Sequence, residues 1–131
     1  MAASGILSSM HPARWWRPAE RGKLLCTLCP RYCLVGEGQA GFCYIRQNHG
    51  GQLWNAAYGR STGFAVDPIE KKPLNHFFPG TNVLSFGTAG CNLGCKFCQN
   101  WDISKARLDD ERSRPVAPSQ VIDLAEAQGC P

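Results

Sequence analysis

Three cysteines at positions 91, 95 and 98 constrain this chain more than any other feature, because one short segment carries them with three and then two residues between them. Thiolates at that spacing can each bind a different iron of a cubic iron–sulfur cluster, which leaves the fourth iron without a protein ligand. An open iron can bind a small molecule and pass an electron to it, whereas four thiolates would make a closed electron carrier. The spacing therefore favours an enzyme.

The eight cysteines of the 131-residue chain could form either a disulfide framework or sets of metal ligands. Seven of them fall into two tight groups, Cys26, Cys29, Cys33 and Cys43, then Cys91, Cys95 and Cys98. Disulfide frameworks usually spread their cysteines more widely along the chain. The grouping therefore favours metal ligands, and Cys130 is left as a lone thiol.

Each group allows more than one metal. The second group could bind structural zinc with a fourth ligand such as His76 or Cys130, but structural zinc sites usually pair two short two-cysteine turns, so its spacing favours a cluster. The first group offers four thiolates within eighteen residues, a closed set that suggests a structural role. Zinc and a second iron–sulfur cluster are both open for this first group.

Composition and charge indicate a globular protein, since 44% of the residues are apolar and 18% are charged. The N-terminus has no apolar run of signal-peptide length, and no stretch approaches the length of a membrane span, so we expect a cytoplasmic protein with no membrane partner. The formal net charge of +4 falls to about +1 if the seven grouped cysteines are counted as metal-bound thiolates. Without a long basic block, a nucleic-acid partner is not expected.

The local patterns predict short strands at residues 23–26 and 52–58, and an apolar run at 82–86 suits a buried parallel strand. A helix is expected from Pro118, with Gly129 after its last turn. The predicted fold class is α/β, with a cysteine-rich metal-binding lobe of short strands followed by one βα unit. The expected segments are a lead-in over residues 1–22, the four-cysteine lobe over 23–66, a connector over 67–81 and the βα unit over 82–131.

Four further motifs accompany the three-cysteine segment. They are Cys26-Thr-Leu-Cys29-Pro-Arg-Tyr-Cys33, Gly36-Glu-Gly-Gln-Ala-Gly-Phe-Cys43, Asp67-Pro-Ile-Glu-Lys-Lys-Pro-Leu74 and Leu84-Ser-Phe-Gly-Thr-Ala-Gly-Cys91. Together with aromatic Phe97 before Cys98, this set resembles the radical S-adenosylmethionine superfamily. Within it, the chain is most similar to the AmmeMemoRadiSam-system enzymes, which are relatives of the pyruvate formate-lyase activating enzymes.

The resemblance implies a [4Fe–4S] cluster on Cys91, Cys95 and Cys98, whose fourth iron is chelated by the amino and carboxylate groups of S-adenosylmethionine. One electron from the reduced cluster would break the sulfur–C5′ bond and give methionine and a 5′-deoxyadenosyl radical, which abstracts hydrogen from a substrate that could be a protein. Phe97 would lie beside the bound adenine. A low-potential donor such as flavodoxin or ferredoxin would supply the electron, and no catalytic side chain is carried over.

The resemblance also implies that the βα unit is the first of a partial (β/α) barrel. A barrel of eight such units needs about 250 residues, and residues 82–131 have room for little more than one. We therefore expect the chain to be a C-terminally truncated piece of a longer enzyme, whose methionine and ribose contacts come from later strands.

Two alternatives stay open beside this hypothesis. The first is an activase that places a glycyl radical on a partner protein, and the second is a non-catalytic zinc-binding module. Lys71, Lys72 and His76 fit either a solvated connector or a segment that touches the cluster or the substrate. Trp101 fits either a core position or a wall of the cofactor site.

Overall fold

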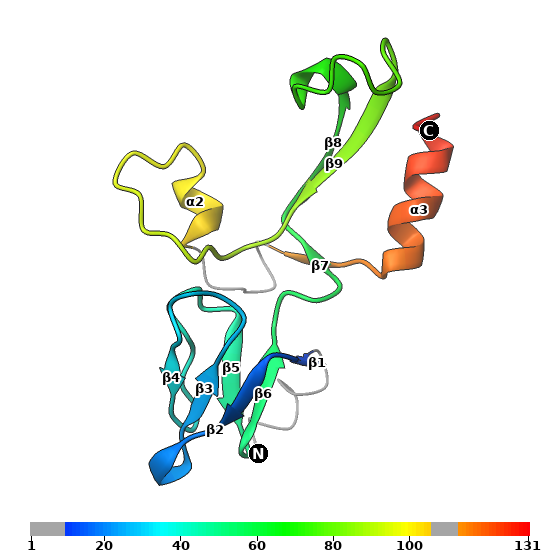
Figure 1. Ribbon diagram of the computed structural model, residues 1–131. Coiled ribbons are helices and arrows are strands. Elements are labelled where there is room, and N and C mark those ends of the chain that lie inside the picture. The colour runs from blue at the N-terminus through cyan, green and yellow to red at the C-terminus, as the bar shows by residue number, and fades with distance from the viewer. Residues whose placement is uncertain (1–9, 106–112) are drawn as a thin grey trace. The chain divides into compact units, whose positions relative to one another are not determined.

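The computed structural model describes residues 10–105 and 113–131, and the chain divides into two compact units. Unit 1 comprises Met1–Tyr58 and Ala89–Asp110, and unit 2 comprises Gly59–Thr88 and Glu111–Pro131. Figure 1 shows that the described elements of both units are short strands and helices. The two cysteine groups therefore belong to the same unit, although more than forty residues separate them in the sequence.

The N-terminal lobe of unit 1, residues 10–58, contains a first antiparallel sheet in the order β1-β6-β5. Its strands are β1 (His11–Pro12), β5 (Arg46–His49) and β6 (Gln52–Asn55). Gly50 and Gly51 join β5 to β6 with φ angles of +67° and +74°. A two-residue hairpin turn with positive φ at both positions matches the twist of the strands and is open to glycine at little cost.

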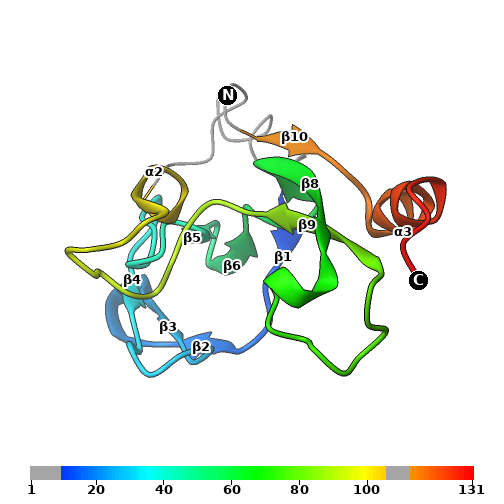
Figure 2. The same ribbon diagram turned by 90° about the horizontal axis from the view of Figure 1, so that it is seen from above.

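A second antiparallel sheet of the lobe has the order β2-β3-β4. Its strands are β2 (Trp16–Pro18), β3 (Leu24–Cys26) and β4 (Leu34–Val35), and the 3₁₀ turn η1 (Glu20–Gly22) joins the first two. Figure 2 shows these three strands from above, next to one another. The strands predicted at 23–26 and 52–58 are thus present as β3 and as β6, the second of them shorter than expected.

The hydrophobic core of the lobe is small and is shared by both sheets. It contains Leu24, Cys26, Val35 and Leu53, and Leu53 is fully buried. Burial of one leucine side chain contributes about 1.5–3 kcal/mol. The buried Asn48 on β5 donates a hydrogen bond from Nδ2 to the Val35 carbonyl on β4 at 2.9 Å, which ties the two sheets together.

Unit 2 is built on a pair of longer strands. Strand β8 (Gly63–Pro68) pairs antiparallel with β9 (Asn82–Gly87) along its whole length, and the 3₁₀ turn η2 (Ile69–Lys71) follows β8. A second antiparallel pair joins β7 (Arg60–Ser61) to β10 (Arg114–Pro115). Both pairs are two-stranded, so backbone groups along their outer edges are not paired with a further described strand.

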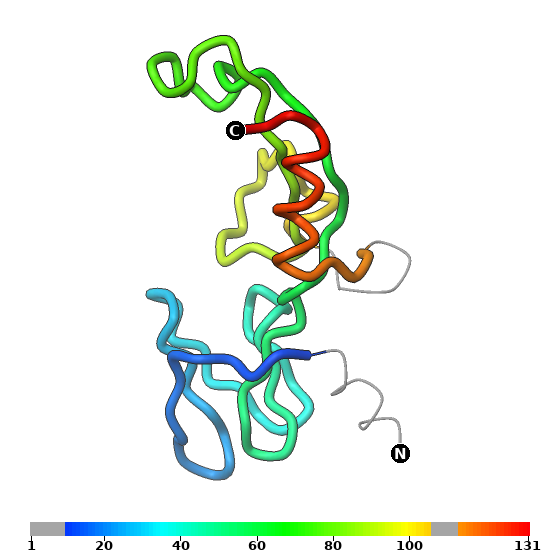
Figure 3. Tube along the Cα trace, turned by 90° about the vertical axis from the view of Figure 1, so that its right-hand side faces the viewer, coloured from blue at the N-terminus to red at the C-terminus, as the bar shows by residue number. Residues whose placement is uncertain are grey.

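Two α-helices complete the described chain. The single turn α2 (Trp101–Ser104) belongs to unit 1, and α3 (Pro118–Ala127) belongs to unit 2 and follows β10 along the tube of Figure 3. Helix α3 begins at a proline, as predicted, and the Ala117 amide donates to Gln120 Oε1 at 2.7 Å before its first turn. In the described part of the chain, neither helix has the length and apolar character that a membrane crossing requires.

The predicted α/β fold class is wrong, because the described strands form small antiparallel sheets. The apolar run at residues 82–86 is a strand, but its partner is β8 in antiparallel register and not another parallel strand. It is therefore not the first βα unit of a partial barrel. An apolar run indicates a buried strand without fixing the direction of its neighbour, which is why the pattern misled. The four predicted segments stay a prediction about domain boundaries.

Candidate metal centre

The three-cysteine loop, residues 89–100, follows β9 and runs without regular structure into α2 (Figure 2). Cys91 and Cys98 are half-buried and Cys95 is exposed. All three are free thiols. The loop therefore offers three sulfur ligands, one of them fully accessible.

The loop is tied back to the residues that follow it. The Gly90 amide donates a hydrogen bond to the Ile103 carbonyl of α2 at 2.9 Å. The Lys105 ammonium group donates to the Cys91 carbonyl at 3.5 Å. These two bonds tie both ends of the segment 90–105 together. They therefore reduce the conformational entropy that the loop would lose on metal binding.

Hydrogen-bond partners lie against two of the three sulfurs. The Leu93 amide donates to Cys91 Sγ at 3.4 Å, and the Ser104 hydroxyl lies 3.5 Å from Cys98 Sγ. Helix α2 fixes Ser104, because its amide donates to the Asn100 carbonyl at 2.8 Å. Donors directed at ligand sulfurs orient the ligands and tune the potential of a metal site.

The start of the loop packs closely against the N-terminal lobe. A Cβ atom placed on Gly90 would overlap the Ile45 side chain and would lie 2.6 Å from the Cys43 carbonyl oxygen. The φ angle of Gly90 is +96°, which residues with a side chain rarely adopt. Glycine at position 90 is thus required both by its backbone and by the approach of the segment that carries Cys43.

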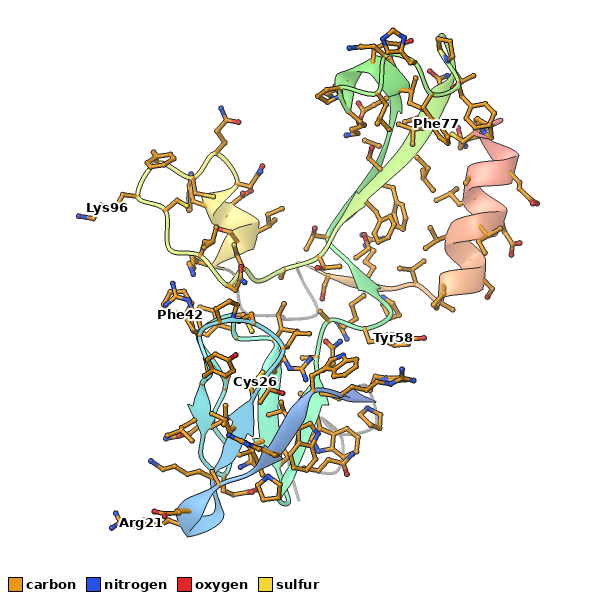
Figure 4. All side chains as sticks on the ribbon, viewed as in Figure 1. Arg21, Cys26, Phe42, Tyr58, Phe77 and Lys96 are labelled. Carbon is orange, nitrogen blue, oxygen red and sulfur yellow. The ribbon has the colours of Figure 1, made fainter. Side chains whose placement is uncertain are left out.

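The first cysteine group has one member in a strand, Cys26 of β3, and three in the loops of the lobe. Cys26 is 6% exposed in the core, where Figure 4 marks it, and Cys33 packs against that core. The Cys26 amide donates to the Cys33 carbonyl at 2.9 Å across β3 and β4. The Phe42 amide in turn donates to Cys33 Sγ at 3.5 Å, so Cys33 lies beside the turn that carries Cys43. Cys29 is half-buried.

A metal was predicted at both groups, and the structure can be compared with what each metal requires. Among residues 10–105 and 113–131, no three His, Cys, Asp or Glu side chains converge as the ligands of one metal ion. Thiolates are ligands of both structural zinc and iron–sulfur clusters. Three free thiols on one closed loop, two of them with hydrogen-bond partners, fit the donor set of a cluster. The metal at Cys26, Cys29, Cys33 and Cys43 stays a prediction.

Two aromatic side chains of the loop region are strongly exposed. Phe97 is 88% exposed and Trp101 is 72% exposed. Trp101 is therefore not a core residue, which was one of the two alternatives for it. Both rings have free faces for a ligand, and the role of Phe97 beside adenine stays a prediction.

The segment with Lys71, Lys72 and His76 lies in unit 2. Asp67 binds Lys71 at 2.8 Å and Lys72 at 3.2 Å. The hydrogen bond from Lys71, followed by that from Lys72, lowers the pKa of Asp67 from 3.8 to about 2. In the same turn, the hydrogen bond from the Gly80 amide lowers the pKa of Glu70. These contacts pair both lysines with Asp67 within unit 2, and a contact of this segment with the cluster or the substrate stays a prediction.

Sequence reasoning missed four side chains around the three-cysteine loop. They are Arg31, Phe42, Ser104 and Lys105, which contact the loop or its cysteines. One signal was available for Phe42. It directly precedes Cys43, the last cysteine of the first group, as Phe97 directly precedes Cys98, the last cysteine of the second group. The cations carry no such signal.

Comparison with known proteins assigns no activity. No family model matches the chain, and no solved structure matches it significantly. The chain is similar to the uncharacterized protein MJ0808 of Methanocaldococcus jannaschii, with 41% identity over 93% of this chain and 37% of that protein. It is also similar to the uncharacterized protein MJ0674 of the same organism, with 24% identity over 77% of this chain and 25% of that protein. The chain thus spans about a third or less of the length of these relatives.

Proposed function

We propose that this chain carries the cluster-binding segment of a radical S-adenosylmethionine enzyme, with a [4Fe–4S] cluster on Cys91, Cys95 and Cys98. The observation that supports this most is the closed loop of three free thiols, with a hydrogen-bond partner at two of the sulfurs. The proposal rests on this loop and on the motif resemblance. It does not depend on a βα unit, which the fold does not have.

Two residues of the loop and one of α2 have defined tasks in this proposal. The Leu93 amide and the Ser104 hydroxyl hold two ligand sulfurs in position, and the exposed ring of Phe97 packs against the adenine of S-adenosylmethionine. Cys91, Cys95 and Cys98 would hold the cluster, which would supply one electron for cleavage of the sulfur–C5′ bond of S-adenosylmethionine to methionine and a 5′-deoxyadenosyl radical that would take hydrogen from a substrate. A low-potential protein such as flavodoxin or ferredoxin supplies that electron.

The first cysteine group has a structural role in the same proposal. Burial of Cys26 in the core and the hydrogen bond from Phe42 to Cys33 Sγ favour ligands that hold the lobe together over ligands open to substrate. Zinc or a second cluster would serve, since closed four-thiolate sites contribute directly to folding.

Metal analysis of the full chain, reconstituted anaerobically with iron and sulfide, tests the proposal. We expect about four irons per chain that require the second cysteine group, in addition to any metal that the first group binds. Cys95→Ala should abolish this iron, while Cys130→Ala, which removes the cysteine outside both groups, should leave it unchanged. Zinc alone, with no iron taken up, would contradict the cluster.

Electron paramagnetic resonance then separates a radical S-adenosylmethionine site from an ordinary cluster. Added S-adenosylmethionine should change the spectrum of the reduced cluster, because the cofactor binds the iron that lacks a protein ligand. An unchanged spectrum at saturating cofactor would contradict the enzyme proposal while leaving the cluster in place.

A further inference from the structure

Phe42, which Figure 4 labels, lies where the N-terminal lobe meets the three-cysteine loop. Two cations lie against its ring. The Arg31 guanidinium carbon is 3.6 Å from the ring centroid, and the Lys105 ammonium nitrogen is 4.0 Å from it. Both distances are well inside the range of cation–π attraction. One aromatic ring therefore joins a cation of the lobe to a cation that follows the loop.

The same two cations hold the main chain of the loop. Arg31 Nε donates to the Asn92 carbonyl at 2.5 Å, and Lys105 Nζ donates to the Cys91 carbonyl at 3.5 Å. They thus bind two successive carbonyls at the first of the three cysteines. Guanidinium and ammonium groups bound to neighbouring carbonyls repel each other, and the electron-rich face of Phe42 offsets that repulsion.

Phe42 also lies against Gly94, the residue before Cys95, and binds a cysteine of the first group. Its Cζ atom is 3.3 Å from the position that a Cβ on Gly94 would take, beside Cys95. Its amide donates to Cys33 Sγ in the first group. The residue therefore connects the core-packed cysteines of the lobe to the exposed part of the loop.

We propose that Phe42, together with Arg31 and Lys105, positions the three-cysteine loop on the N-terminal lobe and so presents Cys91 and Cys95 for metal. The inference rests on the proposed cluster for its chemical purpose, whereas the positioning itself belongs to the chain without metal. Phe42 is a positioning residue in this scheme, because it acts through the loop.

The test compares three variants of the full chain by nitrogen-15 NMR relaxation. Phe42→Leu keeps an apolar side chain but removes the ring, and Phe42→Tyr keeps the ring. Phe64→Leu is the matched control, because Phe64 is 39% exposed where Phe42 is 40% exposed, and it lies in unit 2. We expect the order parameters of residues 91–96 to fall from about 0.85 to below about 0.6 in Phe42→Leu alone.

A second readout follows iron in the reconstituted chain. Removal of iron by a chelator should be at least about five-fold faster in Phe42→Leu than in the wild type, the factor that loss of two exposed cation–π contacts implies for loop opening. Phe42→Tyr should restore the wild-type rate. Unchanged order parameters and an unchanged rate in Phe42→Leu would overturn the inference and leave the proposed cluster intact.

The remaining outcomes are also decisive. If the wild-type chain takes up no iron, the proposed function fails, and the order parameters still decide the positioning role. If Phe42→Leu unfolds the lobe, Arg31→Gln replaces it, since that variant keeps the ring and removes one cation and the bond to Asn92. Loss of order at residues 91–94 with β3 and β6 intact supports the inference, and wild-type order there overturns it.

Discussion

Units 1 and 2 hold themselves together by different means. The N-terminal lobe in unit 1 closes a core around the fully buried Leu53 and ties its two sheets through Asn48. In unit 2, Ile69 is the buried apolar side chain of the described residues, while Phe64 and Phe86 face each other across β8 and β9 and stay exposed. Both cysteine groups therefore lie in the unit with its own core, whereas the contacts of unit 2 are mainly strand pairing and exposed ion pairs.

Gly90→Ala should have the largest effect and should affect unit 1 alone, because it separates the three-cysteine loop from the N-terminal lobe. The positive φ costs roughly 1–3 kcal/mol for a residue with a side chain. Overlap with Ile45 and the Cys43 carbonyl adds roughly another 1–3 kcal/mol. We expect hydrogen exchange of the position-90 amide, bonded to Ile103 in the wild type, to accelerate at least about thirty-fold, while the amides of β8 and β9 keep their rates.

Gly38→Ala provides the matched control for this variant. Gly38 has a φ angle of +71°, but a Cβ atom there would meet nothing within 4 Å. Its substitution therefore measures backbone strain without overlap. Equal acceleration of amide hydrogen exchange at positions 38 and 90 would mean that the overlap between loop and lobe adds nothing to the cost of Gly90→Ala.

Serine substitutions at the two cysteine groups should have unequal effects on the free energy of unfolding. Cys26→Ser buries a hydroxyl in the core and should cost about 1–3 kcal/mol in urea denaturation followed by the fluorescence of Trp16 and Trp54. Cys95→Ser changes an exposed side chain and should stay within about 0.5 kcal/mol in the metal-free chain. Similar losses at both positions would remove the distinction between a core-packed group and an open one.

Local pattern was enough to predict where several elements lie. The strands at β3, β6 and β9 and the helix from Pro118 follow from apolar runs, turn residues and a proline in the first helical turn. The pairing of β9 could not be predicted in this way, because its partner β8 begins with a glycine and ends with a proline, and the 13 residues between the two strands are more than a short hairpin loop contains. The apolar run of β9 was therefore taken for a buried parallel strand, and that direction was wrong.

The candidate site also has a part that the sequence predicts and a part that it does not. Spacing identified the cysteines, because ligand spacing is a local property of the sequence. Arg31 and Asn92 lie 61 positions apart, and no periodicity links a cation to a carbonyl at that separation. Contacts of this kind depend on how the loop packs on the lobe, and that packing has no local signature.

Ser104→Ala should produce a smaller effect that concerns only the three-cysteine loop. Removal of the hydroxyl beside Cys98 Sγ should lower the reduction potential of the proposed cluster, because a hydrogen bond to the sulfur stabilises the more negative reduced state. A bond of about 1 kcal/mol corresponds to a shift on the order of 40 mV in a redox titration. Ser104→Thr keeps the hydroxyl and serves as the control, and an unchanged potential in the alanine variant would remove Ser104 from the site.

The smallest expected effect tests the role of charge in unit 2. The pKa of Asp67 is about 2 in the folded chain against an ordinary value of 3.8, so folding favours its ionised form. The stability from its pairs with Lys71 and Lys72 is therefore fully present above pH 3.8 and is lost as the pH falls through about 2. Carbon-13 titration of the Asp67 carboxyl group should give that midpoint in the wild type. Lys71→Gln should move it toward 3.8 more than Lys72→Gln does, because Lys71 makes the shorter bond at 2.8 Å. A wild-type midpoint near 3.8 would mean that these pairs do not hold the turn after β8, and strand pairing alone would then remain to support it.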